Sequence, residues 1–415
     1  MKPTSCVVAR FAKPTAAFVA VLVLAAVATV PANAHHKNKE DKTVQVVVKV
    51  QWGHDPASVA ADLDAELIDV LLGGRRVILV ETNDKDVKAA VKRLTKDKRI
   101  VWAEENEVGS TPEGDRFHAW PSETWPREAN SLDRNTQPAV TALGLDAAHA
   151  LATGKGVTIA VLDTGVDASH PALKGKVKRR LDVIDDDFDP DDVGNGLDDD
   201  GDGHVDEAVG HGTHVAGAIL LAAPEAKVLA YRVLNSDGQG TAFGVAEAVR
   251  HAVDEGADII NISFGADKKI DSTVLKDAIK HAKDSGVLVV AAAGNSSSDK
   301  KRYPAADAEV VSVGAYDPAK NELAKFASHG KWVTVAAPGV DITSTIPGGG
   351  YATWSGSSMA APFVSAQAAL LLSVDHDLSL SELIKLIKDN TDKLKGKKLD
   401  KGAVDYLRSI EKAAK

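Results

Sequence analysis

Residues 157–163, Val-Thr-Ile-Ala-Val-Leu-Asp, begin the part of the chain that decides its fold. This run is almost continuously apolar and ends in a carboxylate, which is typical of a strand buried on both faces of a parallel sheet. Five more runs of this kind follow, most of them separated by amphipathic stretches of helical length. These further strands are expected at residues 227–234, 258–263, 287–293, 310–315 and 333–337.

The stretches between and after these strands predict helices. They lie at residues 212–221, 242–255, 272–285, 358–373 and 380–388. Strands alternating with helices predict an α/β domain with a mostly parallel sheet, which we place at residues 141–415. In such sheets ligand chemistry gathers beyond the carboxyl ends of the strands. Polar residues that directly follow a strand are therefore the first candidates for a site.

The first 34 residues have the features of a secretory signal peptide. Lys2, Arg10 and Lys13 give a basic leader, residues 16–30 are apolar at all but one position, and Ala32-Asn33-Ala34 offers a cleavage site. The apolar run is shorter than the roughly 20 residues that a membrane-spanning helix needs. We therefore expect a signal peptide at residues 1–34, a secreted protein and no stable membrane insertion afterwards.

Composition narrows the classes of function. The chain has 415 residues, 44% of them hydrophobic, and a formal net charge of −10. An acidic chain is unsuited to nonspecific binding of nucleic acid, so we expect no nucleic-acid partner. The single cysteine, Cys6, lies in the leader. The mature protein would then have no disulfide, no thiolate metal site and no cysteine nucleophile.

Residues 35–110 precede the α/β region and have a pattern of their own. Strands are expected at residues 43–50, 76–81 and 100–104, a helix from Asp55-Pro56 to about Asp69, and a second from Asn83-Asp84 to about Lys96. This order predicts a small α+β domain with helices on one face of a sheet. Residues 111–140 are rich in Pro, Ser, Glu and Asn, which indicates a linker and an irregular arm.

Three short segments carry the side chains of an acyl-transfer site. Asp163 ends the strand quoted above, His211 begins a helix of small residues, and Ser358 begins an apolar helix. A serine hydroxyl becomes a nucleophile when an adjacent base takes its proton, and imidazole titrates near neutral pH. A buried carboxylate fixes the tautomer of that imidazole. Asn295, after the strand at residues 287–293, supplies an amide donor for an oxyanion, with the N–H of Ser358 as the second.

Each residue taken singly has a simpler interpretation. Asp-Thr-Gly also occurs in aspartic peptidases, but those need two copies and this sequence has one. His211 and His214 are spaced as metal ligands on one helical turn, but the glutamate base of the zinc-peptidase helix is missing. Ser358 alone would be a helix cap. The four segments together, each in its expected strand or helix context, favour catalysis.

In their order and wording these segments resemble the subtilisin-like serine peptidases (the S8 family). The similar segments are Asp163-Thr-Gly165, Gly210-His211-Gly-Thr-His214, Gly294-Asn295 and Ser355-Gly-Ser-Ser358-Met-Ala-Ala-Pro362, and the resemblance spans about residues 145–372. It implies a secreted endopeptidase that forms an acyl-enzyme, on a three-layer α/β/α fold with a mostly parallel seven-stranded sheet. Asp163, His211 and Ser358 take the places of the triad and Asn295 that of the oxyanion residue, whereas His214 is structural. Ser357 stands where the family usually has threonine.

The resemblance also assigns substrate contacts, which are protein or peptide chains. It places Ser263, Phe264 and Gly265 on one side of an extended substrate, and Gly238 and Gly240 on the other. Strand addition of this kind uses exposed main-chain groups. Arg302 lies in the segment at the base of the first specificity pocket, and an inward-facing arginine there would favour acidic residues before the scissile bond.

Residues 35–110 resemble the inhibitory propeptide of this family (inhibitor I9 type), a ferredoxin-like domain. By that resemblance the domain assists folding, inhibits the enzyme and is removed by the enzyme itself, with a cut between Glu107 and about Arg116. We expect the product to be a monomer. Residues 35–110 could alternatively be a permanent accessory domain. For the whole protein two alternatives stay open: an inactive binding protein of the same fold, and an acid-active sedolisin-type enzyme, which His211 and Asn295 disfavour.

An acidic loop precedes His211. In residues 195–206, carboxylates stand on alternate residues with glycines at the turns, so several oxygens can converge on one hard cation such as Ca²⁺. The loop departs from the EF-hand pattern, which has a glutamate at its twelfth position. The predicted ligands are Asp198, Asp200, Asp202 and Asp206 by their side chains and His204 by its carbonyl. The alternatives are a solvated acidic loop and a calcium-dependent adhesin.

Overall fold

The computed structural model describes residues 43–71, 76–111, 127–128, 137–266, 272–395 and 399–415. The expected signal peptide lies outside the described residues, as does most of the expected linker. All described residues belong to a single compact unit.

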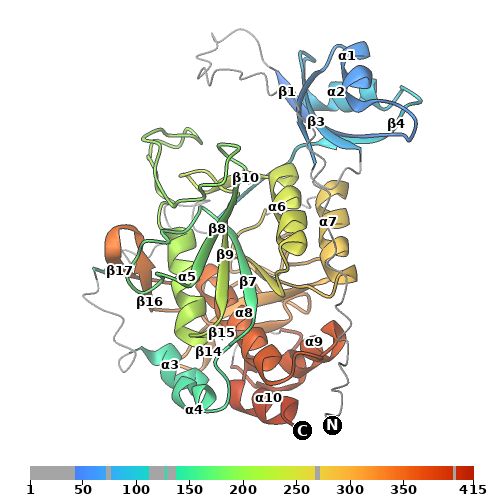
Figure 1. Ribbon diagram of the computed structural model, residues 1–415. Coiled ribbons are helices and arrows are strands. Elements are labelled where there is room, and N and C mark those ends of the chain that lie inside the picture. Colours follow the sequence, from blue (N-terminus) through green and yellow to red (C-terminus); the bar gives the residue numbers. More distant parts are fainter. Residues whose placement is uncertain (1–42, 72–75, 112–126, 129–136, 267–271, 396–398) are drawn as a thin grey trace, which may run out of the picture. The chain divides into compact units, whose positions relative to one another are not determined.

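A mostly parallel sheet forms the centre of the larger domain (Figure 1). Seven strands make consecutive parallel pairs, as the resemblance implied. In sheet order they are β8 (Val177–Asp182), β9 (Lys227–Arg232), β7 (Thr158–Asp163), β11 (Ile259–Ile262), β12 (Leu288–Ala292), β13 (Val310–Asp317) and β15 (Val335–Pro338). Three two-residue strands extend the sheet to ten: β14 (Glu322–Leu323), β18 (Thr391–Asp392) and β19 (Ala403–Val404).

Strand β8 was not among the strands expected from the sequence. Its residues Lys178, Arg179 and Arg180 interrupt the apolar pattern, and the strand lies at the edge of the sheet. Charged side chains are common on edge strands because they discourage pairing with another chain. The same charges remove the periodicity from which the other strands were predicted.

Helices cover both faces of this sheet. Side chains of β7 alternate between two cores: Ile159 and Val161 lie in one and Ala160 and Leu162 in the other, as the two-residue period of a strand requires. The first core contains α5 (His211–Ala222) and α8 (Ser357–Val374), and the second contains α6 (Ala242–Asp254) and α7 (Thr273–Asp284). The predicted three-layer arrangement is therefore confirmed.

Shorter elements complete this domain. They are α3 (Pro138–Leu143), α4 (Leu145–His149), α9 (Leu380–Asp389), α10 (Tyr406–Ala413), the strands β10 (Gln239–Thr241), β16 (Ile342–Ile346), β17 (Gly350–Trp354) and β6 (Arg127–Glu128), and the 3₁₀ turn η1 (Pro347–Gly349). Helix α8 is long and apolar enough to cross a membrane, but 89% of it is buried, which explains its composition as that of a core helix.

The first domain has the element order β1 (Val44–Val50), α1 (Pro56–Asp62), β2 (Glu66–Val70), β3 (Val77–Thr82), α2 (Val87–Leu94) and β4 (Ile100–Glu105). Its antiparallel sheet has the order β2-β3-β1-β4, which is the ferredoxin-like arrangement. A short strand, β5 (Val108–Ser110), follows it.

Two sequence predictions in this domain were wrong. The first helix does not reach Asp69: Asp64 adopts a left-handed φ of 49°, and residues 66–70 form strand β2. Helix α2 is capped by Asp86, whose side chain accepts from the N–H of Ala89, and not by Asn83-Asp84. Asp84 instead pairs with Arg93 at 2.8 Å. A capping residue next to a second acidic residue is hard to locate from sequence because both can accept the same N–H groups.

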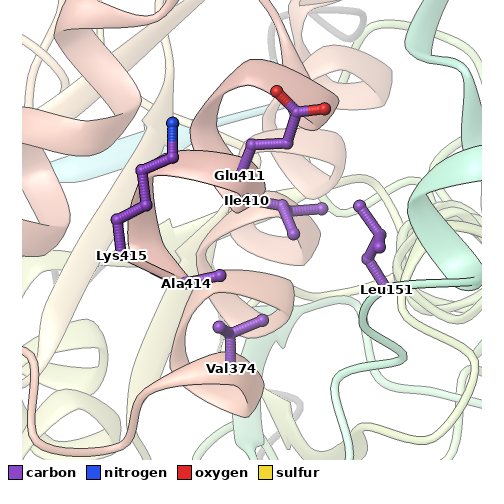
Figure 2. Close-up of a pocket in the computed structure, with 6 residues that line it drawn as sticks. All are labelled: Leu151, Val374, Ile410, Glu411, Ala414 and Lys415. Atoms are coloured by element: carbon purple, nitrogen blue, oxygen red, sulfur yellow. The ribbon is translucent and has the colours of Figure 1, made fainter.

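One surface pocket lies at the carboxyl end of the chain. Leu151, Val374, Ile410, Glu411, Ala414 and Lys415 line it (Figure 2). Val374 and Ser358 are at opposite ends of α8, about 24 Å apart at the rise of an α-helix. This pocket is therefore remote from the residues expected to carry the chemistry.

Candidate active site

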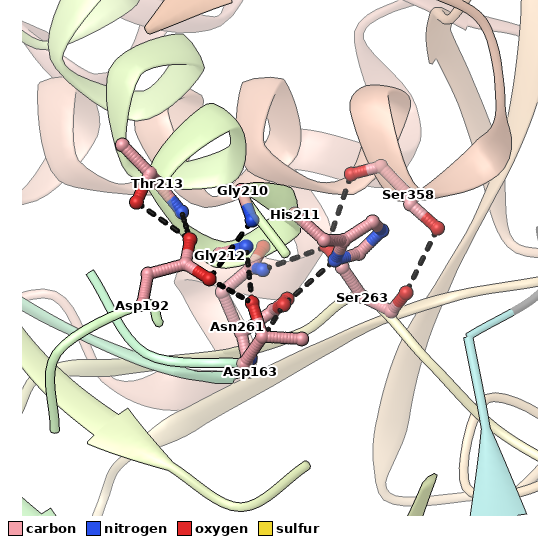
Figure 3. Close-up of polar contacts among 10 residues, drawn as sticks. Asp163, Asp192, Gly210, His211, Gly212, Thr213, Asn261, Ser263 and Ser358 are labelled. Atoms are coloured by element: carbon pink, nitrogen blue, oxygen red, sulfur yellow. Dashed lines mark hydrogen bonds and ion pairs between the residues drawn. The ribbon is translucent and has the colours of Figure 1, made fainter. Parts of the chain in front are cut away.

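Asp163 and His211 are brought together by two different elements. Asp163 is the last residue of β7 and is fully buried, and His211 is the first residue of α5. Asp163 Oδ1 lies 2.6 Å from His211 Nδ1 and also accepts from the N–H of Thr164 at 2.8 Å (Figure 3). The carboxylate therefore fixes the orientation of the ring and keeps a proton on Nδ1, which leaves Nε2 as the basic nitrogen.

Glycine is required where the two elements meet. A Cβ on Gly212 would collide with the main-chain oxygen of Gly165 and lie 2.9 Å from the Cβ of Asp163. The first turn of α5 therefore approaches the turn after β7 as closely as main chain can. This close approach allows the short contact between Asp163 and His211.

Ser358 lies in the first turn of α8 and is buried. Its hydroxyl donates to the carbonyl oxygen of Ser263 at 2.8 Å, and the Ser263 hydroxyl donates to the carbonyl oxygen of Ser358 at 3.0 Å (Figure 3). The second bond has a local cause. In a regular helix the carbonyl of Ser358 would accept from residue 362, but that residue is proline and has no N–H. The Ser263 hydroxyl satisfies this buried carbonyl instead.

Asn295 is held beside the start of the same helix. Its Oδ1 accepts from the N–H of Ser357 at 2.9 Å, so the Nδ2 group is directed to the opposite side of the amide. The hydroxyl of Ser357 accepts from the N–H of Gly294 at 2.9 Å. Serine therefore supplies the acceptor at the position where the family usually has threonine.

His214 is a structural residue. Its ring stacks on Trp354 at 4.6 Å with an interplanar angle of 7°. Its Nε2 lies 3.1 Å from the carbonyl of Ile342 and 3.2 Å from that of Ala352. Carbonyls only accept, so Nε2 carries a proton and cannot be a metal ligand. Burial, with a smaller effect of His211, lowers the pKa of His214 to about 3 and keeps it neutral.

The predicted substrate segments already enclose a strand of this chain. Strand β5 pairs with β10, with Gly109 opposite Gly240, and the N–H of Thr111 donates to the carbonyl of Gly238 at 3.1 Å. On the other side, Ser110 and Gly265 exchange two main-chain hydrogen bonds of 3.0 and 3.2 Å. Residues 108–111 therefore lie as an extended strand between the two segments.

The other predicted substrate residues differ in their placement. Arg302 is buried, and its Nη2 donates to the carbonyl of Gly265 at 2.8 Å and to that of Ser110 at 3.4 Å. It therefore faces inward, beside strand β5. Ser263 contacts Ser358, as described above. The Phe264 side chain is buried in the second core.

The acidic loop brings together three of the five predicted ligands. Single carboxylate oxygens of Asp198, Asp200 and Asp202 all lie within 4.8 Å of one another. The carboxylate of Asp206 is not part of this group, and it accepts from the N–H groups of Asn195 and Gly196 at 2.9 to 3.2 Å. Charged oxygen donors are the ligands that a hard divalent cation such as Ca²⁺ prefers, and three of them converge here.

Sequence reasoning missed one buried carboxylate near this site. Asp192 is 2% exposed and accepts hydrogen bonds from the turn after β7 and from the first turn of α5. Burial raises its pKa to about 6, although its hydrogen bonds act in the opposite direction. The sequence does not distinguish it from the other aspartates of the acidic stretch, most of which are exposed.

Comparison with known proteins agrees with this geometry. Residues 154–404 match the model of the subtilase family (Peptidase_S8). The chain is 38% identical over 323 residues to a thermophilic serine proteinase of Bacillus sp. (strain AK1), covering 75% of this chain and 72% of that protein. It is also 38% identical over 256 residues to thermitase of Thermoactinomyces vulgaris, covering 59% of this chain and 85% of thermitase.

A solved structure shares the fold. Fervidolysin of Fervidobacterium pennivorans, described as a keratinolytic enzyme related to subtilisin, superposes with a TM-score of 0.72 at 24% identity. The superposition covers 91% of this chain and 62% of that one, so the chain spans less than two thirds of the fervidolysin chain. Family model, relatives and fold agree, and the chain belongs to the subtilase family of serine proteases, which hydrolyse peptide bonds.

Proposed function

We propose that the chain is the precursor of a secreted serine endopeptidase, with Ser358 as nucleophile, His211 as general base and Asp163 as its orienting carboxylate. The 2.6 Å contact between Asp163 and His211 carries the proposal, because a buried carboxylate on Nδ1 gives a histidine the tautomer that a general base needs.

The proposed reaction has two halves. Ser358 Oγ forms a bond to the substrate carbonyl carbon while its proton passes to His211 Nε2, and the resulting oxyanion accepts from Asn295 Nδ2 and the N–H of Ser358. Collapse breaks the C–N bond, and His211 returns the proton to the leaving amine. Water then repeats the sequence on the acyl-enzyme and releases the carboxylic acid. Before attack, Ser358 Oγ must leave the carbonyl of Ser263, to which it donates.

The first domain is proposed to be an inhibitory propeptide, residues 35–110. Support comes from strand β5, which occupies the place where an extended substrate would add to Gly240 and Gly265. The N-termini of two helices also contact this domain. Glu104 accepts from the N–H groups of Thr273 and Val274 in α7 at 2.8 and 3.0 Å, and Asn106 accepts from that of Phe243 in α6 at 3.1 Å.

Processing is proposed to occur in cis, at a bond beyond Thr111. Residues 108–111 are hydrogen-bonded between the two segments that the family resemblance assigns to an extended substrate, so we place the bond that reaches Ser358 further along the chain. Within the predicted window from Glu107 to about Arg116, the proposal therefore favours a bond after Thr111. The linker and arm would then begin the mature enzyme, residues 141–415 forming its α/β domain, and we expect that enzyme to be a monomer.

Arg302 is proposed to select acidic residues before the scissile bond. A Cβ on Gly294 would lie 2.7 Å from the Cδ of Arg302, so the arginine side chain fills the space between Gly294 and Gly265 beside the bound strand. A buried guanidinium there would pair with a carboxylate. Peptides that differ only in Glu, Phe or Leu at that position test this, and a preference for Phe or Leu would contradict it.

One experiment tests the function and the processing together. Wild type and Ser358→Ala are expressed as full chains, and the N-termini of the secreted products are sequenced. We expect a cut after Ala34 in both proteins and a second cut beyond Thr111 in wild type alone. A fluorophosphonate probe should label wild type and not Ser358→Ala. Labelling of both proteins, or a second cut in both, would contradict the assignment of Ser358.

A further inference from the structure

Asp192 accepts four hydrogen bonds from two separate elements (Figure 3). Its Oδ1 accepts from the Thr164 hydroxyl at 3.0 Å and from the N–H of Gly210 at 2.9 Å. Its Oδ2 accepts from the N–H of Thr213 at 3.0 Å and from the Thr213 hydroxyl at 2.6 Å. Thr164 follows Asp163 directly, while Gly210 and Thr213 flank His211. One carboxylate therefore connects the turn that carries Asp163 to the helix turn that carries His211.

These bonds complete the first turn of α5. The N-cap residue, Gly210, has no side chain that could cap the helix. The N–H groups of Gly210 and Thr213 donate to Asp192, that of Gly212 donates to the Thr164 hydroxyl at 3.0 Å, and that of His211 donates to the carbonyl of Ala208 at 3.0 Å. The N–H groups of the first turn, which have no partner within the helix, are therefore all hydrogen-bonded. The carboxylate also lies at the N-terminus of the helix, the positive end of its dipole.

The direction of each hydroxyl proton is consistent with an ionised carboxylate. The Thr164 hydroxyl accepts from Gly212, and the Thr213 hydroxyl accepts from the N–H of Asp167 at 3.0 Å. Each hydroxyl therefore has its proton available for Asp192. All four donors are neutral groups, so the carboxylate is held by directed hydrogen bonds whose geometry depends on both elements.

We propose that Asp192 is a positioning residue for catalysis, which holds the Asp163 turn and the His211 turn in register so that His211 is aligned as general base. It acts through these two residues and does not touch substrate. The inference rests on the proposed function of Asp163, His211 and Ser358. A shift of the ring by about 1 Å can lower the rate of the chemical step by about a hundredfold.

The test is Asp192→Asn in the full chain, with Asp191→Asn as matched control. The asparagine side chain has one oxygen and one NH₂ group. Its NH₂ group would face the backbone N–H of either Gly210 or Thr213, and two donors that face each other repel. Asp191 is the adjacent carboxylate, and it pairs with the exposed Arg179. The number of competent sites is taken from prolonged labelling with a fluorophosphonate probe, and kcat is expressed per labelled site. Misfolded protein lowers the number of labelled sites, whereas a misaligned but folded enzyme lowers kcat per site.

We expect kcat per site to fall roughly 10- to 100-fold in Asp192→Asn, with KM within about twofold of wild type, because the four hydrogen bonds of Asp192 do not involve the proposed substrate segments, residues 238–240 and 263–265. Asp191→Asn should keep kcat per site within about twofold. A kcat per site that is unchanged in Asp192→Asn, or a loss confined to KM, would overturn the inference. If Asp192→Asn yields no competent sites, Thr213→Val, which removes one donor, is measured in the same way. A loss in its kcat per site supports the inference, and an unchanged value overturns it.

The series also includes Ser358→Ala. Hydrolysis by Ser358→Ala above background would contradict the proposed function itself. Loss of hydrolysis in Ser358→Ala together with an unchanged kcat per site in Asp192→Asn would contradict only the positioning role.

Discussion

At the scale of single residues, the start of α8 combines several requirements at one place. Proline at 362 removes the N–H that would satisfy the carbonyl of Ser358, and the Ser263 hydroxyl satisfies it. The proposed nucleophile, Ser358, is thereby tied to the segment that is proposed to bind substrate. On its other side, Ser357 connects the helix to Gly294 and Asn295. The position of Ser358 is therefore defined from both sides before any substrate arrives.

The first prediction concerns Asn295. Replacement by alanine removes the amide donor but keeps the backbone, so we expect kcat to fall about 10²- to 10³-fold with little change in KM. Asn321→Ala, at an exposed turn, is the control and should not change either constant. Steady-state kinetics on a peptide substrate provide the measurement. A large rise in KM with normal kcat would assign Asn295 to substrate binding and not to the oxyanion.

At the scale of elements, α5 is joined to the hairpin of β16 and β17 through His214. The ring donates to carbonyls of both strands and stacks on Trp354. A buried neutral imidazole is compatible with the fold at neutral pH but lowers the stability of the folded state in acid. The reason is that the unfolded chain binds a proton that the folded chain excludes.

The second prediction is a pH dependence of stability from His214. Its pKa is about 3 in the fold against 6.5 unfolded. Because the pKa is lower in the folded state, the neutral ring contributes its full share to the free energy of unfolding above pH 6.5. This contribution is lost as the pH falls towards 3, by up to about 5 kcal/mol for this fully buried group. Thermal unfolding is followed from pH 7 to 3.5 on Ser358→Ala, with and without His214→Phe. The phenylalanine variant should start lower and lose stability less steeply; equal slopes would contradict the prediction.

The third prediction concerns the N-terminus of α7. Glu104 accepts from two N–H groups there, so Glu104→Gln should weaken the hold of the first domain roughly three- to tenfold. Glu105→Gln changes the adjacent, exposed carboxylate and serves as the control. The measurement is the time course with which activity appears in purified full-chain protein. Activity should appear earlier in Glu104→Gln alone. If both variants follow wild type, the contact does not contribute to inhibition.

At the scale of the whole molecule, stability must come without covalent links. The only cysteine lies in the expected signal peptide, so burial on both faces of the sheet supplies most of the free energy of folding. The acidic loop before α5 is exposed and dense in like charges. A bound cation would neutralise this repulsion and restrain the loop that leads to His211.

The fourth prediction is that a calcium chelator lowers Tm and activity. A site at a hundredfold excess of free calcium over Kd adds about 2.7 kcal/mol, which corresponds to roughly 5–10 °C for a domain of this size. Asp200→Asn should lower Tm in calcium and make it insensitive to chelator, whereas Asp377→Asn, outside the loop, should respond as wild type does. A wild-type Tm that is unchanged by chelator would exclude calcium as a stabilising ligand.

Local sequence patterns were enough to predict the layered fold and to single out the four segments that we propose as the site. Buried strands and amphipathic helices have a local period, and Asp163, His211, Asn295 and Ser358 follow directly at strand and helix ends. The prediction that helix α1 reaches Asp69 was wrong because a single left-handed residue, Asp64, ends it, and no periodicity announces such a turn.

The acidic residue that connects the Asp163 turn to the His211 turn could be identified only from the packing of distant segments. Asp192 lies in a stretch of mostly exposed aspartates, and what distinguishes it is burial against Thr164 and Thr213, residues 28 and 21 positions away. Likewise, three of the five predicted cation ligands converge, while the carboxylate of Asp206 is held outside this group by the N–H groups of Asn195 and Gly196. Local patterns specify where a segment begins and which face it buries. The partner of a buried polar group is specified by packing between distant segments, which leaves no periodic mark in the sequence.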